Sequence, residues 1–193
     1  MGDSLIGVKG KDFVIVAADA HEAFSIIRLH DCADKIITID DDKLLAAGGP
    51  NGDRRQFSQF IQKNAHLYRL RNGVKLSTAE VANFTRGELA QALRKGPYQC
   101  DMLIAGVDEG TGPELYFLDY LASMAKIDYA AHGYSAYFIW GLLDRYWTKD
   151  MTEEQALAVV RRCVNEASQR IVLNISAFKV KVVDKNGVRE VTL

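Results

Sequence analysis

The sequence predicts one α+β domain, residues 1–193, in which helices and antiparallel sheets form separate layers. Two observations predict this class. Strand-like runs rich in β-branched and aromatic residues come in groups, and helical patterns come in pairs between those groups. Such grouping is typical of layered folds rather than of alternating β–α units. The chain is long enough for one sizeable core, but the pattern leaves the number of sheets open.

The first part of the chain predicts two hairpins. Residues 5–9 and 13–18 flank the polar turn Lys-Gly-Lys-Asp, and residues 35–39 and 43–47 flank the turn Asp-Asp-Asp. Each run carries the Val, Ile, Leu and Phe content of a strand, and each turn is polar.

Two helices are predicted next. The first has an apolar stripe at helical spacing, and Gly73 is expected to end it. Ser77 and Glu80 form a capping box that starts the second helix, and Gly96-Pro97 is expected to stop it. The predicted inner face of the first helix consists of Phe57, Phe60, Ile61, Asn64 and Tyr68.

The second half repeats this order. Strands are expected at residues 99–108 and 115–119, with another near 125–130, followed by a helix from Gly133 towards Trp147. Thr152 and Gln155 then cap a further helix. A strand at 178–183 and the Asn-Gly turn lead to residues 188–193, which are either a final paired strand or a tail that docks on a partner.

Composition excludes several classes of protein. The net charge is −1, so the overall charge favours neither nucleic acid nor an anionic membrane as a partner. The longest apolar runs are far shorter than the roughly 20 residues of a membrane span. Cys32, Cys100 and Cys163 are too scattered for a zinc site or a disulfide framework, which favours buried, reduced thiols. We expect no metal and no cofactor.

Short motifs, taken in their order and spacing, carry a resemblance over residues 5–193. They include Gln-Lys-Asn at 62–64, Ala-Asn-Phe-Thr-Arg at 82–86, Leu-Ile-Ala-Gly-Val-Asp at 103–108, Ala-Ala-His-Gly-Tyr at 130–134 and Asp-Lys-Asn-Gly at 184–187. With these motifs the chain resembles the beta subunits of the 20S proteasome, and within them the eukaryotic beta type-2 group, the fourth position of the beta ring.

The resemblance implies a four-layer αββα sandwich of the N-terminal nucleophile hydrolase type. It also implies that the partners are other proteasome alpha and beta subunits, stacked in heptameric rings. That particle degrades mostly ubiquitin-tagged proteins in the cytoplasm and the nucleus.

The resemblance also points to a missing nucleophile. Active beta subunits carry an N-terminal threonine shortly before a Val/Ile-Gly pair, and here Ile6-Gly7 places that register near Asp3 or Ser4. In such enzymes the free amine acts as the base beside the hydroxyl. Asp19 and Lys35 match the family's helper positions, but without the threonine they are expected to form a buried ion pair kept for packing.

Of the other positions that are functional in active members of the family, one matches in this chain and three differ. Gly49 matches the turn whose backbone N–H forms the oxyanion hole, although a strand-to-helix turn needs glycine geometry in any case. Active members have a serine after the glycine that opens the third helix, where this chain has Tyr134. They also have Arg-Asp-x-x-Ser near the end of the fourth helix, where Ile171 and Asn174 stand instead of the Asp and the Ser.

These features predict a non-catalytic structural subunit with no catalytic residue of its own. One alternative is an active hydrolase that uses Ser4 after trimming of residues 1–3, although the family cleaves after glycine. We expect the mature chain to begin at Met1 or Gly2. A second alternative is a free-standing cytosolic protein on the same fold. His30 and Cys32 also suggest a dyad, but neighbours in sequence rarely face each other, so we expect no such site.

Overall fold

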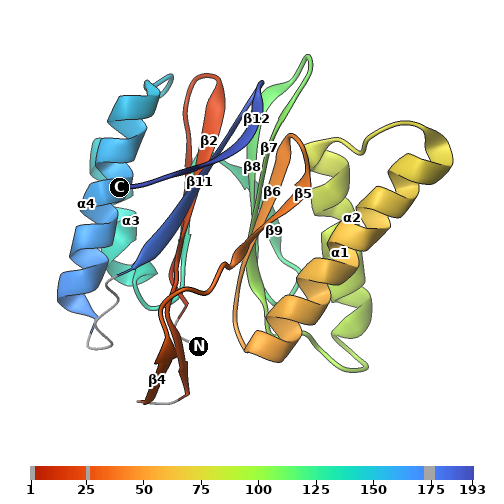
Figure 1. Cartoon of the computed structure of the whole chain (residues 1–193), viewed down its shortest axis with the longest axis horizontal. Coiled ribbons are helices and arrows are strands. Elements are labelled where there is room, and N and C mark those ends of the chain that lie inside the picture. The colour runs from red at the N-terminus through yellow and green to blue at the C-terminus, as the bar shows by residue number, and fades with distance from the viewer. Residues whose placement is uncertain (1–2, 25–26, 172–176) are drawn as a thin grey trace.

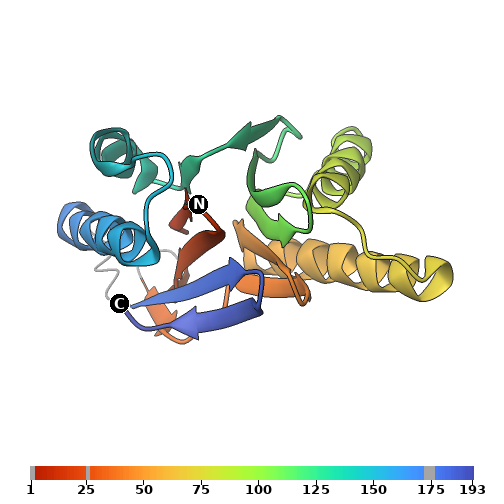
Figure 2. The same ribbon diagram turned by 90° about the horizontal axis from the view of Figure 1, so that it is seen from above.

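The computed structural model describes residues 3–24, 27–171 and 177–193. Viewed edge-on, the chain forms four layers: a pair of helices, two sheets face to face, and a second pair of helices (Figure 1). The view from above shows one helix pair on each outer side (Figure 2). The predicted αββα sandwich is therefore confirmed.

The first sheet has the strand order β10-β1-β2-β11-β12, and every pair in it is antiparallel. Its strands are β1 (Leu5–Lys9), β2 (Phe13–Asp19), β10 (Tyr129–His132), β11 (Phe178–Asp184) and β12 (Gly187–Val191). The last strand pairs with β11 from Val180↔Val191 to Asp184↔Gly187, so residues 187–191 belong to the sheet and are not a free docking tail.

The second sheet has the order β5-β6-β7-β8-β9 and is also antiparallel. Its strands are β5 (Ile36–Asp40), β6 (Lys43–Gly48), β7 (Asp101–Asp108), β8 (Gly112–Leu118) and β9 (Met124–Ile127). The single strand expected near residues 125–130 is wrong: the segment forms β9 and β10, one in each sheet.

Helices α1 (Asn51–Asn72) and α2 (Thr78–Ala92) cover the second sheet, and α3 (Ala136–Tyr146) and α4 (Glu153–Arg170) cover the first (Figure 1). Local signals set most of their ends. Gly73 follows α1 at φ 71°, which L side chains rarely adopt.

The capping boxes at Ser77 and Thr152 begin α2 and α4, as predicted. Gly96-Pro97 does not end α2, because the helix stops four residues earlier, at Ala92, and a hydrogen-bonded turn follows.

The core lies in three layers, one between the sheets and one under each helix pair. Side chains of β1 and β2 alternate between two of them, as strand geometry requires: Ile6 and Ile15 face α4, whereas Leu5 and Val14 face the other sheet. On α1, Phe57 and Ile61 are buried as predicted, but Phe60 and Tyr68 are each 40% exposed. The stripe is thus narrower than its sequence pattern indicates.

A small hairpin of β3 (Glu22–Phe24) and β4 (Ile27–His30) was not predicted. It projects from the end of the sandwich at which the N-terminus lies (Figure 1). Among the described helices, none is both long and apolar enough to cross a bilayer.

Candidate functional site

The candidate site lies at the end of the sandwich from which the β3–β4 hairpin projects, and a buried lysine, Lys35, is at its centre. Asp19 is the last residue of β2, and Lys35 directly precedes β5, so the two sheets bring them together. The Lys35 Nζ donates to Asp19 Oδ2 at 2.8 Å, and both side chains are almost fully buried. The predicted buried ion pair therefore forms.

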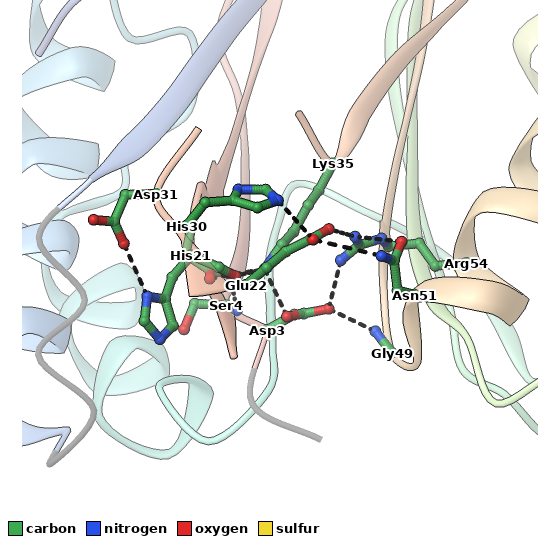
Figure 3. A network of polar contacts seen from close by, with 11 residues as sticks. Asp3, Ser4, His21, Glu22, His30, Asp31, Lys35, Gly49, Asn51 and Arg54 are labelled. Carbon is green, nitrogen blue, oxygen red and sulfur yellow. Dashed lines mark hydrogen bonds and ion pairs between the residues drawn. The ribbon is translucent and has the colours of Figure 1, made fainter. Parts of the chain in front are cut away.

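Lys35 has no donor left for another group. Its ammonium has three N–H groups. Besides Asp19, they reach Asp3 Oδ1 at 2.6 Å and the backbone carbonyl of His21 at 2.8 Å. A nucleophile that relied on Lys35 would have to accept one of these three hydrogen bonds. Asp3 already accepts one of them (Figure 3).

The second carboxylate oxygen of Asp3 sits on the Gly49 turn. The Gly49 backbone N–H donates to Asp3 Oδ2 at 2.8 Å. Gly49 adopts φ 129°, and an added Cβ would lie 2.1 Å from the Gln99 carbonyl oxygen, so only glycine fits here. The amide that resembles an oxyanion-hole donor is thus occupied by a side chain of the same protein.

Arg54 completes the surroundings of Asp3 and was missed by sequence reasoning. Its guanidinium donates to Asp3 Oδ2 at 3.1 Å and to Glu22 Oε1 at 2.6 Å. A signal was available, because Arg54 stands on the buried face of α1 one turn before Phe57 and Ser58. A charged residue on such a face requires a partner.

Glu22 links this cluster to the β3–β4 hairpin. It begins β3 and also contacts His30 Nε2 at 2.9 Å. Figure 3 shows Glu22 between His30 and the Arg54–Asn51 pair. His21 is buried, and its Nδ1 lies 3.1 Å from Asp31 Oδ1.

Ser4 is poorly placed for nucleophilic chemistry. Its side chain is fully buried, and its Oγ finds no hydrogen-bond partner within the described part of the chain. Its backbone nitrogen is a peptide amide that donates to Asp19 Oδ1 at 2.6 Å. Gly133, at φ 86°, packs so tightly here that a Cβ would lie 2.0 Å from the Asp3 carbonyl oxygen.

The pKa of Asp19 is not set by its ion pair with Lys35 alone, because burial and the neighbouring Asp3 also act on it. Burial raises the pKa of the Asp19 carboxyl although Lys35 acts in the opposite direction, and the nearby Asp3 raises it further. Within the described residues, the carboxylates of Asp3, Asp19 and Glu22 form their ion pairs with permanent cations to Lys35 and Arg54.

A cavity of about 360 Å³ adjoins the cluster. Lys35 and Arg54 are among its lining residues, together with Glu22, His30, Asn51 and Arg55, so most of its wall is polar.

Of the remaining predicted site positions, the described ones have no hydrogen bond or ion pair with this cluster. Tyr134 is 58% exposed, beside the buried Ser135. Ile171 directly follows α4 and packs against the apolar core layer beneath that helix. Asn174 lies outside the described residues.

The cysteines partly depart from expectation. Cys100 and Cys163 are buried, and burial raises the pKa of each thiol to about 12, which makes them unreactive. Cys32, however, is exposed, and its Sγ lies 3.7 Å from His30 Nδ1, so the expectation that these neighbours do not face each other is wrong. Among the described residues no group of three or more His, Cys, Asp or Glu could hold a metal ion.

Comparisons with known proteins identify the family of this chain. A family model described as "Proteasome subunit" matches residues 1–183. Proteasome subunit beta type-2-B of Arabidopsis thaliana is 47% identical over 188 residues, which cover 97% of this chain and 94% of the relative. Proteasome subunit beta type-2 of Dictyostelium discoideum is 38% identical over 190 residues, covering 97% and 96%.

Proteasome subunit beta type-4 of Saccharomyces cerevisiae is 38% identical over 191 residues, covering 98% of this chain and 96% of the relative. These matches agree with the αββα layers of the structure. The chain therefore belongs to the proteasome subunit family, among its beta subunits.

Proposed function

We propose that this chain is a beta-ring subunit that contributes no nucleophile of its own. One observation carries the proposal: every donor of Lys35 is used, and one of them is held by Asp3. A carboxylate at that position has no proton to give up and no hydroxyl with which to attack. Its second oxygen also occupies the Gly49 N–H, which an oxyanion would require.

The role that remains is structural. As a proteasome beta subunit, the chain is a component of the 20S core particle, which is built from alpha and beta subunits and carries out ubiquitin-dependent degradation. In this proposal the subunit completes the ring and helps to wall the chamber in which neighbouring subunits cleave peptides. We place it in the cytoplasm and the nucleus, where that particle works.

The test uses assembled particles that carry Lys35→Met in this subunit. We expect each peptidase class to keep its specific activity, measured with fluorogenic peptides and divided by the amount of full-size particle. Lys43→Met is the matched control, because Lys43 is also a buried lysine between two aspartates but lies away from the site. A full-size particle that loses one peptidase class only with Lys35→Met would overturn the proposal.

The alternative nucleophile, Ser4, has a separate readout. It can act only with a free amine, and therefore only after removal of residues 1–3. The intact mass of the subunit, taken from purified particles, shows whether this happens. We expect no species that begins at Ser4, and finding one would support the active alternative.

A further inference from the structure

The Asp3 carboxylate is held by three donors that come from separate parts of the fold. Lys35 Nζ lies 2.6 Å from Oδ1, Gly49 N lies 2.8 Å from Oδ2, and Arg54 Nη1 lies 3.1 Å from Oδ2. They precede β5, follow β6 and open α1, respectively. Two cationic donors and one amide around both oxygens of a carboxylate make a strong, specific arrangement.

These donors keep their positions through contacts that do not involve Asp3. Lys35 is held by Asp19 and by the His21 carbonyl, and Arg54 is held by Glu22 and Asn51. The Gly49 amide is fixed by a backbone conformation that admits only glycine. The donor set is therefore preorganised, and a preorganised site costs less to occupy.

Removal of the Asp3 side chain leaves unsatisfied donors rather than a net positive charge. Asp19 and Glu22 still neutralise Lys35 and Arg54, one each. What remains unpaired is one N–H from each of three groups, in a place that is already partly buried. A buried donor without an acceptor destabilises the fold, and this supplies the driving force for an anion to enter.

The same place can be reached from solvent. The Asp3 side chain is 18% exposed, and the cavity of about 360 Å³ is lined by Lys35 and Arg54, two of the three donors. A small monocarboxylate is far smaller than this volume.

The geometry points to a carboxylate-binding cradle, formed by Lys35, Gly49 and Arg54, that Asp3 fills from within and that accepts a free carboxylate once this side chain is removed. The inference rests on the proposed function and deepens it. Asp3 then acts as a built-in ligand, which keeps peptide carboxylates and carbonyls out of the site in the native subunit.

The test is a chemical rescue of Asp3→Ala in the full chain. Thermal unfolding is followed with increasing sodium acetate, against sodium chloride at equal ionic strength. We expect the midpoint of Asp3→Ala to rise by about 2 °C or more with acetate over chloride, and to saturate, as binding to the folded state requires. The wild-type chain, whose cradle is full, should show no saturable difference.

Asp128→Ala is the matched control. The Asp128 side chain is 46% exposed and forms an ion pair with Lys9 on another part of the molecule. Its loss leaves no converging donors, so acetate should restore nothing. An equal acetate response in Asp3→Ala, Asp128→Ala and wild type would show a general salt effect and overturn the inference.

Two further variants cover failure of Asp3→Ala to fold. Asp3→Ser opens the same space with a small polar side chain and should also respond to acetate, whereas Asp3→Asn fills the cradle and should not. Asp3→Ser without any acetate response would overturn the inference. None of these readouts measures peptide cleavage, so a failed rescue leaves the non-catalytic proposal intact, and a newly active particle would contradict only the latter.

Discussion

Two buried lysines stand at opposite ends of the β5–β6 hairpin, and each lies between two aspartates. Lys35 precedes β5 and contacts Asp3 and Asp19. Lys43 begins β6 and contacts Asp42 at 3.0 Å and Asp108 at 2.8 Å. Both lysine side chains are at most 2% exposed.

The aspartates that contact the two lysines differ in burial, and the pKa shifts of Asp19 and Asp108 have opposite directions. Burial raises the pKa of Asp19, which is only 2% exposed. Burial acts in the same direction on Asp108, but the hydrogen bonds from Lys43 and Thr78 outweigh it and leave the pKa of that carboxyl below its ordinary value.

The comparison teaches that a buried Lys–Asp pair does not by itself indicate catalysis. The Lys43 cluster joins β6 and β7 to the start of α2, where Thr78 N donates to Asp108 at 2.7 Å. The Lys35 cluster likewise has a lysine between two aspartates, but it joins Asp3 to both sheets. Only its position beside Asp3 and Gly49 makes it a candidate site.

The largest expected difference between the clusters concerns loss of the lysine. Lys35→Met leaves Asp3 and Asp19 close together in a buried place, and we expect the free energy of unfolding to fall by about 3–5 kcal/mol. Lys43→Met should cost less, about 1–3 kcal/mol, because Asp42 and Asp108 are 27% and 13% exposed. Urea unfolding of the two full-length variants measures both values. Equal losses would show that burial of the partners does not decide the cost.

The second prediction concerns the backbone that holds Asp3. Gly133→Ala combines φ 86° with a Cβ 2.0 Å from the Asp3 carbonyl, so we expect a loss of about 2–4 kcal/mol. Gly73→Ala is the control: φ is 71°, but a Cβ there meets nothing within 4 Å, and the expected loss is only about 1 kcal/mol. The difference between their urea midpoints isolates the contact with Asp3. If the two variants lose the same stability, the N-terminal segment is not tightly packed against Gly133.

The smallest effect is a difference in pH dependence. The lowered pKa of Asp108 means that its ionised form stabilises the fold above its ordinary pKa of 3.8, and that this stabilisation is lost as the pH falls through the lower value. The cost of Asp108→Asn should therefore be full at pH 7 and pH 5 and smaller at pH 3.5.

Asp19→Asn should show the opposite sign. The raised pKa of Asp19 means that its ionised form costs stability at neutral pH, and that wild type regains this stability as the pH falls towards 3.8. The apparent cost of Asp19→Asn should therefore grow on acidification. Urea unfolding at pH 7, 5 and 3.5 compares the two variants, and a common trend would contradict the opposite pKa shifts.

The sequence by itself determined the features whose hydrogen bonds close within three or four residues. The capping boxes at Ser77 and Thr152 and the glycine at 73 were predictable for this reason, since the two partners of each hydrogen bond lie three or four residues apart in the chain. The strand-rich and helix-rich runs likewise predicted the layers, because side-chain periodicity is local. The family motifs added the pairing of Asp19 with Lys35.

Only the tertiary structure decided which distant groups meet. The separation of β9 and β10 into different sheets depends on strand pairing across the domain, not on their own residues. Phe60 has a large apolar side chain of the kind found in protein cores, yet the packing of α1 leaves it 40% exposed. Arg54 reaches Asp3 across 51 residues, and Lys35 reaches it across 32. Contacts of such separation leave no periodic trace in the sequence, because they arise only when the whole sandwich brings three strand ends and one helix start to the same point.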